Sequence, residues 1–508
     1  MRRILWLSGA AAAAMGVALT SGAIAATDRQ EPLCRRAPEL AQLPPEIELQ
    51  QQQQRMEYEP EPGEEAADSS SVVMAPPPPP PPPLPPAAER GGDSDEVAVT
   101  GSRVARPTLE SPSPVTAMPA PPAAPAESAS RRPDYRRPPI SPPAGLLTAG
   151  DYDDLLNPML YARYVVRAAR DLGQQVTGLP RVDTRRTVTI NVEDSAGRPS
   201  PFVPVKVTCV DGNSLTLSTL ADGRAVFFPG LDRLGSRITV SAAGAQRTLD
   251  IPADSGGQQQ TLVARTNASP VRKFDLMITL DSTGSMGDEI EFLKSELRSI
   301  VGDISAHYPQ LDIRVGLVAY RDIGDEYVTR TSRLTSELNV IQASLNRTRG
   351  TGGGDMPEAM DQALIRAVGQ DWRPDAIKSM LLVADAPPHD ALQGRAFAAA
   401  EAARARRIQI VPVASSGVDK RAEYFMRAVA AATQSRYIFL TDDSGIGNPH
   451  AEPDVDCYVV TQLATAIRRV LASQISGQRI EPHPGEVIRT LGRYDHGKCV
   501  LPRNFSIQ

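Results

Sequence analysis

The sequence predicts an α/β protein whose largest part is a doubly wound, mostly parallel sheet, preceded by a small β-sandwich and a long leader. Three observations support this. From about Val271, apolar strand-like runs alternate with amphipathic helical stretches, the pattern of a parallel sheet covered by helices. Before it, residues 184–265 contain several short alternating strands. The leader is rich in Pro, Gln and Ala and cannot build a core.

The α/β part is expected over residues 271–475. Its predicted strands are Phe274–Leu280, Ile313–Tyr320, Ser379–Ala384, Ile408–Val413 and Arg436–Leu440. The helix after the first strand has one apolar face, made of Ile290, Leu293, Leu297, Ile300 and Ile304. A last helix is predicted at about Val459–Leu471. In a doubly wound fold, ligands bind outside the carboxyl ends of the strands, so the loops there are the candidate site.

The β-sandwich is expected over residues 184–265. Val188, Ile190 and Val192 alternate with polar residues, and turn signals occur at Asp194-Ser-Ala-Gly197 and Asp222-Gly223. The segment resembles carboxypeptidase-regulatory-like and other immunoglobulin-like bacterial modules, and we assign it a spacer role. Residues 144–180 are predicted to form a short helical segment, with Asp151-Tyr-Asp-Asp154 capping the helix.

Residues 1–25 have the parts of a secretory signal. Arg2 and Arg3 precede the Ala-rich apolar stretch Ile4–Leu19, and Ala23-Ile-Ala25 is a small-residue cleavage site. A single N-terminal membrane anchor is the alternative. No later stretch is long and apolar enough to span a bilayer. We therefore expect an exported protein, in the periplasm or at the surface of a Gram-negative bacterium.

Charge and cysteine content narrow the class further. A net charge of −6 implies no nucleic-acid partner. Export makes disulfides the default for the four cysteines. We predict a Cys457–Cys499 bridge, which would hold the C-terminal tail, residues 476–508, to the α/β part. Cys34 falls in the leader, and Cys209 is expected to be a buried thiol of a sandwich strand. Reduced thiols or a different pairing are the alternatives.

The leader, residues 26–143, contains the Gln50–Gln54 tract and the Pro76–Pro83 run, which predict a structureless linker with stiff polyproline stretches. One strand-like island interrupts it, Glu96-Val-Ala-Val-Thr-Gly-Ser-Arg103. This island resembles the short segment of TonB-dependent outer-membrane receptors that pairs with TonB by strand addition. TonB is therefore one candidate partner, and a bare linker is the alternative.

Oxygen-bearing side chains lie on three loops that follow predicted strands. The first loop carries Asp281, Thr283 and Ser285, the second is Thr351-Gly-Gly-Gly-Asp355-Met-Pro-Glu358, and the third carries Asp385 and His389. Because strand ends share one edge of a parallel sheet, the loops can converge. Oxygen ligands suit a hard cation such as Mg²⁺, Ca²⁺ or Mn²⁺. Helix capping, a glycine turn and backbone contacts of Asp385 are the alternatives.

The spacing Asp-x-Ser/Thr-x-Ser at Asp281–Ser285, together with Asp385, resembles the metal-ion-dependent adhesion site of von Willebrand factor A domains. The resemblance covers about 271–475. It implies a binding module, not an enzyme, whose metal keeps a vacant position that an acidic group of a partner protein fills. The family has a Thr on the second loop, where this chain offers Asp355 or Thr351. A third carboxylate from Asp355 would hold the cation more tightly and make it a weaker acceptor for an incoming acid.

Arg321 and His389 are expected at the rim of the proposed metal site, and two other functions compete with metal-dependent binding. Arg321 can contact a ligand acid or form an ion pair with Asp322 or Asp325, and His389 lies on the same rim. A serine hydrolase would use Ser285 with His389 or His450 as base, but Gly284-Ser-Met-Gly287 lacks the Gly-x-Ser-x-Gly nucleophile elbow. A structural role in a TonB-linked envelope assembly is the other alternative.

Overall fold

The computed structural model describes residues 32–46 and 147–502, except for residues 177, 180, 254–255, 265–267, 355 and 446–448. All of these belong to one unit of the chain, residues 1–58 with 138–508. The second unit, residues 59–137, lies wholly outside the described residues.

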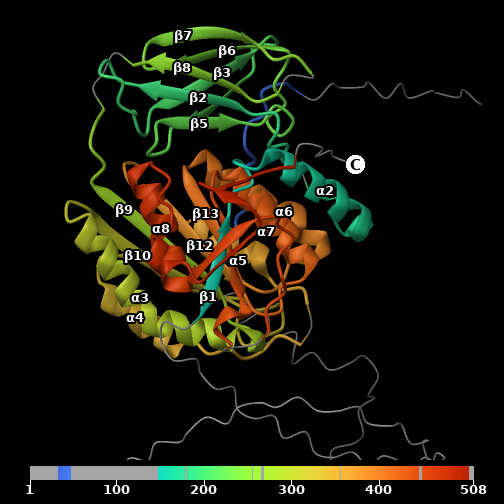
Figure 1. The fold of residues 1–508 in the computed structure, drawn as a ribbon, viewed down its shortest axis with the longest axis vertical. Helices are drawn as coiled ribbons and strands as arrows, with labels where there is room; N and C mark the ends of the chain where they lie inside the picture. Colours follow the sequence, from blue (N-terminus) through green and yellow to red (C-terminus); the bar gives the residue numbers. More distant parts are fainter. Residues whose placement is uncertain are drawn as a thin grey trace, which may run out of the picture. The chain divides into compact units, whose positions relative to one another are not determined.

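Among the described residues, a nine-stranded sheet is the centre of the α/β part (Figure 1). In spatial order its strands are β11 (Thr329–Thr335), β10 (Asp312–Tyr320), β9 (Lys273–Asp281), β12 (Ile377–Ala384), β13 (Ile408–Ala414), β14 (Tyr437–Thr441), β1 (Thr148–Tyr152), β15 (Tyr458–Gln462) and β16 (Arg489–Leu491). The run from β10 to β14 is parallel and contains the five predicted strands, so the predicted fold class is confirmed.

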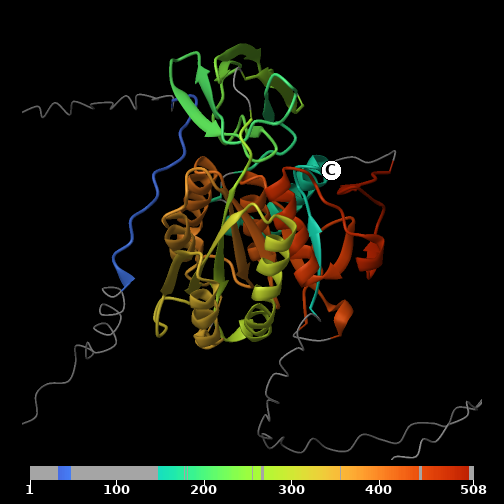
Figure 2. The ribbon, with the colours of Figure 1, turned by 90° about the vertical axis from the view of Figure 1, so that its left-hand side faces the viewer.

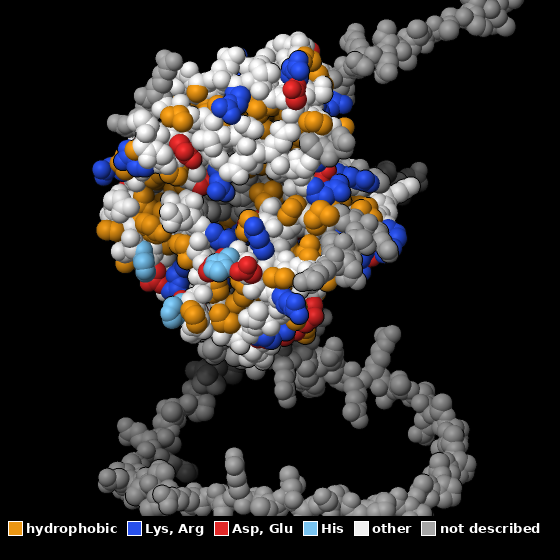
Figure 3. Space-filling model, turned by 45° about the horizontal axis from the view of Figure 1, so that its top comes forward, with side chains coloured by type: hydrophobic (Ala, Val, Ile, Leu, Met, Phe, Trp, Pro, Cys, Tyr) orange, Lys and Arg blue, Asp and Glu red, His pale blue; other side chains and the backbone are white. Residues whose placement is uncertain are grey.

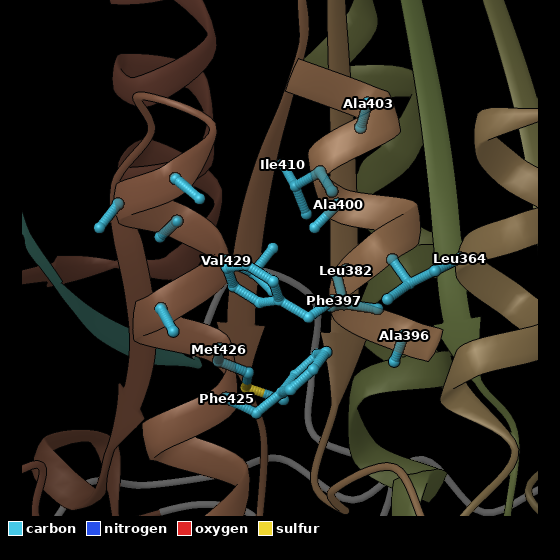
Figure 4. Close-up of a cluster of buried hydrophobic side chains, with 14 of the residues drawn as sticks. Leu364, Leu382, Ala396, Phe397, Ala400, Ala403, Ile410, Phe425, Met426 and Val429 are labelled. Atoms are coloured by element: carbon cyan, nitrogen blue, oxygen red, sulfur yellow. The ribbon is translucent and has the colours of Figure 1, made fainter. Parts of the chain in front are cut away.

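Helices pack on both faces of this sheet. One face carries α3 (Gly287–His307), α4 (Leu338–Arg347) and α8 (Leu463–Ser476), and the other α2 (Pro158–Leu172), α5 (Met360–Val368), α6 (Gln393–Ala405) and α7 (Lys420–Ala432). Successive residues of β12 alternate between the two faces. Figure 4 shows Phe397 of α6 and Phe425 of α7 packed beside Leu382 on the second face. This packing on both sides fixes the strand ends where the site lies.

Short 3₁₀ turns lie at Gly173–Val176, Gly284–Met286, Asp390–Leu392, Asp442–Ser444 and Pro484–Glu486.

The β-sandwich follows α2 in the chain. In its described residues, one sheet has the order β4 (Ser214–Ser218), β3 (Pro204–Cys209), β6 (Arg237–Ala242), β7 (Ala245–Asp250), and the other β5 (Arg224–Phe227), β2 (Val188–Glu193), β8 (Gln258–Val263). The alternating residues Val188, Ile190 and Val192 are buried in its core, as their period predicts. Arg404 of α6 donates to both carboxylate oxygens of Asp232 at 2.7 and 2.8 Å, and both side chains are buried.

The segment 144–180 contains a strand as well as a helix. β1 lies between β14 and β15, antiparallel to both. Asp151 therefore stands in a buried strand, and the expectation that Asp151–Asp154 caps a helix is wrong. Gly150 allows this insertion, because a Cβ there would lie 2.5 Å from the ring of Phe439. α2 is instead preceded by Asn157 and begins at Pro158, a residue suited to the first helical turn.

The C-terminal region adds to the sheet. The predicted Cys457–Cys499 disulfide is confirmed. The predicted helix at Val459–Leu471 starts too early, because Tyr458–Gln462 forms β15 and α8 begins at Leu463. Aromatic and β-branched residues favour a strand there. Beyond α8 the tail supplies β16 and a small hairpin, β17 (Tyr494–Asp495) with β18 (Lys498–Cys499).

A second disulfide joins Cys34 to Cys209, so the expectation of a buried thiol at Cys209 is wrong. Residues 32–46, which the sequence places in the structureless leader, run along the α/β part in an extended course (Figure 2, blue). We call residues 32–46 the strap. Leu40 and Leu43 pack against the core around α5 to α7, and Arg35 pairs with Glu401 of α6.

The surface carries mixed charge. On the face drawn in Figure 3, Lys and Arg side chains are interspersed with Asp, Glu and hydrophobic ones. No helix in the described part of the chain is long and apolar enough to cross a membrane.

Arg427 of α7 attaches β1 and α2 to the rest of the α/β part. Its guanidinium donates to both carboxylate oxygens of Asp154 at 2.7 and 3.1 Å and to Glu423 at 3.0 Å. It also lies 3.7 Å from the ring centre of Tyr164, and its side chain is 1% exposed. Removing it would leave two buried carboxylates without a counter-charge, the costly way to break a buried ion pair.

We expect Arg427→Ala to lower the free energy of unfolding by about 3–5 kcal/mol, the usual cost of removing one partner of a buried ion pair. Lys420→Ala, on the same helix with a side chain 76% exposed, should change it by less than about 0.5 kcal/mol. Urea unfolding followed by circular dichroism measures both. Equal effects of the two substitutions would contradict this role of Arg427.

Candidate metal-binding site at the sheet edge

Loops predicted from the sequence meet at the carboxyl edge of the sheet. β9 and β12 are neighbouring parallel strands with Leu280 opposite Val383, so Asp281 and Asp385 stand at adjacent strand ends. The second loop packs on the first. The amide of Thr351 donates to the carbonyl of Ser282 at 3.2 Å, and the amide of Gly284 donates to that of Gly352 at 3.0 Å. Parallel pairing thus brings distant segments to one place.

Asp281 is fully buried at the centre of the first loop. Its Oδ1 accepts hydrogen bonds from the amide and the hydroxyl of Thr283 at 3.0 and 2.8 Å. The Thr283 and Ser285 hydroxyl oxygens lie 3.4 Å apart. Within the described residues, the Asp281 Oδ2 has no hydrogen-bond partner. A buried carboxylate oxygen without a partner is unfavourable, so its position suits a bound cation.

Asp385 on the third loop is also a buried carboxylate. It is 1% exposed, and neither of its carboxylate oxygens has a hydrogen-bond partner in the described part of the chain. Burial raises its pKa more than the nearby Ser285 hydroxyl lowers it. Burial and then the charge of Asp385 raise the pKa of Asp281. A divalent cation between the two carboxylates would remove this repulsion, and the donors are the hard oxygens that Mg²⁺ or Ca²⁺ prefers.

Glu358 is a buried carboxylate of this site, which the sequence places at the end of the second loop without assigning it as a ligand. It is 3% exposed, and its Oε2 has no hydrogen-bond partner among the described residues. A Cβ on Gly353 would lie 2.9 Å from Glu358 Oε1 and 3.0 Å from Thr283 Cβ, so glycine is required where these side chains approach. Burial, and then the charge of Asp281, raises the pKa of Glu358 to about 9. The sequence did contain a signal for this residue, because Glu358 is an acid three residues after the expected ligand Asp355.

The second loop offers two candidate cation ligands, Asp355 and Thr351, and the structure describes only Thr351. Asp355 lies outside the described residues, so its role stays a prediction. Thr351 is exposed, and its amide holds the first loop. Among the described residues, no three His, Cys, Asp or Glu side chains are arranged to hold a metal ion. The predicted ligand set differs from such a group, because Thr283 and Ser285 supply hydroxyl oxygens.

Arg321 supports the first loop from behind. It is 4% exposed, and its guanidinium donates to the carbonyls of Ser282 at 3.1 Å and Arg349 at 3.0 Å. Its ion pair is with Glu326 at 3.3 Å, so the expected pairing with Asp322 or Asp325 is wrong. Asp325 instead accepts from the amide of Gly353 at 3.0 Å.

The two candidate bases are engaged elsewhere. His389 Nε2 lies 2.6 Å from Asp322 Oδ1, and His450 contacts Ser416 Oγ at 3.2 Å and Asp442 Oδ1 at 2.8 Å. Activating a serine requires a base within hydrogen-bond reach, and neither histidine makes such a bond to Ser285. Ser416 is buried and donates to Glu289 Oε1 at 2.6 Å, so its hydroxyl is engaged by a carboxylate.

Residues 275–448 match the family model described as von Willebrand factor A domain. An ariadne-like RING finger protein of Acanthamoeba polyphaga mimivirus is 33% identical over 118 residues, 23% of this chain and 11% of that protein. The alpha-protein kinase vwkA of Dictyostelium discoideum is 29% identical over 117 residues, 23% of this chain and 19% of that protein. The chain thus spans less than a fifth of the length of these relatives.

Solved structures show similarity at low identity. The pilus adhesin SpaC of Lactobacillus rhamnosus GG, in its open conformation, is 13% identical with a TM-score of 0.29, covering 47% of this chain and 31% of that one. The conserved hypothetical protein BatB of Bacteroides thetaiotaomicron is 15% identical with a TM-score of 0.27, covering 40% of this chain and 98% of that one.

The raised pKa of Glu358 predicts a pH-dependent stability of the metal-free protein. Between its ordinary pKa, near 4.5, and about 9, the folded state keeps a proton that the unfolded state has lost. Stability therefore falls as the pH rises through this window. Glu358→Gln cannot ionise, so its stability should decline less steeply than that of the wild type. Urea unfolding with chelator at several pH values measures this.

Asp250→Asn is the matched control, because Asp250 lies in the sandwich with a side chain 66% exposed. It should follow the wild-type pH dependence. Identical slopes for Glu358→Gln and wild type would show that Glu358 titrates normally in the folded protein.

Proposed function

Because residues 275–448 are a von Willebrand factor A domain, we propose that this protein is a binding module that captures an acidic group of a partner protein through a divalent cation. Asp281, Thr283, Ser285 and Asp385 would hold the cation. The observation that carries this proposal is a set of buried carboxylate oxygens that have no hydrogen-bond partner among the described residues, Asp281 Oδ2 and both oxygens of Asp385, at one edge of the sheet.

Bound there, Mg²⁺, Ca²⁺ or Mn²⁺ would supply the positive charge that lets these carboxylates ionise, and the cation could take a further oxygen ligand from a partner. The chain's own residues provide the orientation. Thr283 fixes one oxygen of Asp281 through two hydrogen bonds, which leaves the other oxygen for the cation. Arg321 donates a hydrogen bond to the carbonyl of Ser282, the residue between Asp281 and Thr283.

The charge of the second loop sets the balance between cation and partner. Glu358, and Asp355 if it coordinates, add negative charge beside Asp281 and Asp385. More carboxylates bind the cation more tightly and make it a weaker acceptor for an incoming acid. We therefore propose that the partner's acidic group contributes one contact among several, and that further surface contacts supply the rest of the affinity.

We propose a non-enzymatic role outside the cytoplasm. Two disulfides, Cys34–Cys209 and Cys457–Cys499, are typical of oxidising compartments. Together with the signal-like residues 1–25, they favour the periplasm or the cell surface of a Gram-negative bacterium. The hydrogen bonds of His389 and His450 leave Ser285 without a base, which argues against the hydrolase alternative.

We expect metal-free protein to bind Mg²⁺, Mn²⁺ or Ca²⁺ with saturable heat in calorimetry, because the cation neutralises buried carboxylates. Asp281→Ala should abolish this heat, and Asp303→Ala, near the far end of α3 and paired with Arg468 of α8, should not change it. Asp355→Thr should weaken cation binding and strengthen capture of an acidic partner if Asp355 coordinates.

Wild-type protein without heat or thermal shift for any of the three cations would overturn the proposal, as would normal binding by Asp281→Ala. Unchanged cation affinity in Asp355→Thr would favour Thr351. A pull-down from envelope extract with and without chelator then tests partner capture, which should be lost when the cation is removed.

The second candidate partner is TonB, through Glu96–Arg103. This segment lies outside the described residues, and the pairing remains a prediction. A synthetic peptide of residues 96–103 should shift resonances of labelled periplasmic TonB, since strand addition changes the backbone hydrogen bonds of the edge strand. A peptide of the same composition in scrambled order is the control. Equal or absent shifts would leave this segment as a bare linker.

A further inference from the structure

The strap ends on the edge strand beside the candidate metal site. The Glu46 carboxylate accepts hydrogen bonds from the Thr331 amide at 3.3 Å, the Thr331 hydroxyl at 2.5 Å and the Thr329 hydroxyl at 3.3 Å. Thr329 lies opposite Tyr320 of β10, and Tyr320 lies opposite Asp281 of β9. Glu46 therefore contacts the sheet at the edge that carries the cation ligands.

Glu46 belongs to an anchored segment. At the other end of the strap, Cys34 is bonded to Cys209 of β3. Between the two ends, Leu40 and Leu43 pack on the core, and Arg366 of α5 donates to the carbonyl of Pro44. These attachments have already ordered the backbone, so the three hydrogen bonds of Glu46 cost less conformational entropy than they would on a free tail. Figure 2 shows the strap running along the α/β part.

A continuous chain of contacts leads from β11 to the first metal loop. It runs through residues 321–328, which we call the buttress. The amide of Arg321 donates to the carbonyl of Val328 at 3.1 Å, just before β11 begins. The Tyr327 hydroxyl lies 2.8 Å from Ser282 Oγ, and the Arg321 guanidinium donates to the Ser282 carbonyl at 3.1 Å. Ser282 stands between the proposed ligands Asp281 and Thr283.

The buttress is firmly held. Tyr327 is 1% exposed, and its ring contacts two guanidinium groups, those of Arg321 at 4.4 Å and Arg330 at 3.9 Å from the ring centre. Glu326 pairs with both arginines. Arg330 is itself part of β11, between the two threonines that Glu46 contacts. A shift of β11 would therefore displace Tyr327, and with it the hydroxyl that contacts Ser282.

We propose that Glu46 is a positioning residue for the metal-binding loop. By holding Thr329 and Thr331 it fixes the buttress, and Tyr327 and Arg321 then fix the backbone of Ser282 between two cation ligands. This inference rests on the proposed function and deepens it. It assigns a role in cation binding to the strap and to the Cys34–Cys209 bridge that anchors it.

Calorimetry with Mn²⁺ tests this coupling. Glu46→Gln keeps the shape of the side chain and weakens its acceptors, and it should reduce Mn²⁺ affinity by about 2- to 30-fold, the range for mutations along a contact network. Glu39→Gln removes the same charge from an exposed position of the strap and should leave the affinity unchanged. The urea midpoint of Glu46→Gln should stay close to wild type, which separates positioning from loss of fold.

A double-mutant cycle tests the proposed route. Tyr327→Phe removes the hydroxyl that contacts Ser282. If Glu46 acts through Tyr327, Glu46→Gln should lose most of its effect in the Tyr327→Phe background, whereas independent sites would give additive losses. Additive losses, or equal affinities of Glu46→Gln and Glu39→Gln, would overturn the proposal.

Hydrogen exchange of the metal-free protein gives a readout that does not depend on cation binding. Glu46→Gln should speed exchange at Thr331 and also at residues 282–284, whose amides bond to Tyr320, Asp281 and Gly352. Wild-type protein that binds no cation would overturn the proposed function, and exchange would still decide this inference. Faster exchange confined to residues 329–331 would show that the effect of Glu46 stops at β11.

Discussion

The parallel pairing of β9 with β10 and β12 is the constraint on which the rest of the structure depends. β9 is buried along nearly its whole length, with helices packed on both faces. Its register places Asp281 beside the end of β10 and next to Asp385 at the end of β12. The carboxylates are therefore forced together by the burial of apolar side chains far from them. Weakening that packing would separate the site before it changed any ligand.

Local signals in the sequence were enough for the central sheet and for the loops at its edge. β9, β10, β12, β13 and β14 follow apolar runs that their period and length identify. The insertion of β1 was missed, because Thr148–Tyr152 contains an aspartate and a glycine and has no strand pattern. The position of β1 depends on Arg427, Arg436 and Arg469, which lie 273 to 318 residues further along the chain and pair with Asp154 or Asp151. The strap was missed for the same reason, since its disulfide and core contacts involve residues remote in the chain.

The residues of the candidate site also fall into those that the sequence predicts and those that only the structure shows. Asp281, Thr283 and Ser285 lie within five residues, and a spacing rule finds them. Asp385 follows a recognisable strand. The sequence names Glu358 as the last residue of the second loop and Arg321 as a rim residue, but it does not predict their contacts, because these depend on the path of the backbone. Gly353 must be a glycine before Glu358 can approach Thr283, and the loop after β10 must fold back before Arg321 can reach the carbonyl of Ser282. A sequence displays the residue types at such positions, while the direction of the side chain follows from tertiary contacts.

The way this chain treats buried charge is the strongest physical argument for a cation at the sheet edge. At the amino end of β9, buried Asp275 receives hydrogen bonds from Arg314 and Arg373 on both of its oxygens. Asp154 and Asp151 are likewise matched by guanidinium groups. At the carboxyl end of the same strand, Asp281 keeps an unpaired oxygen beside Asp385 and Glu358, which also have unpaired oxygens within the described residues. Buried carboxylates without a counter-charge destabilise a fold. A cation from solution would neutralise the buried carboxylates at the carboxyl end of β9, as arginine side chains neutralise Asp275 at its amino end.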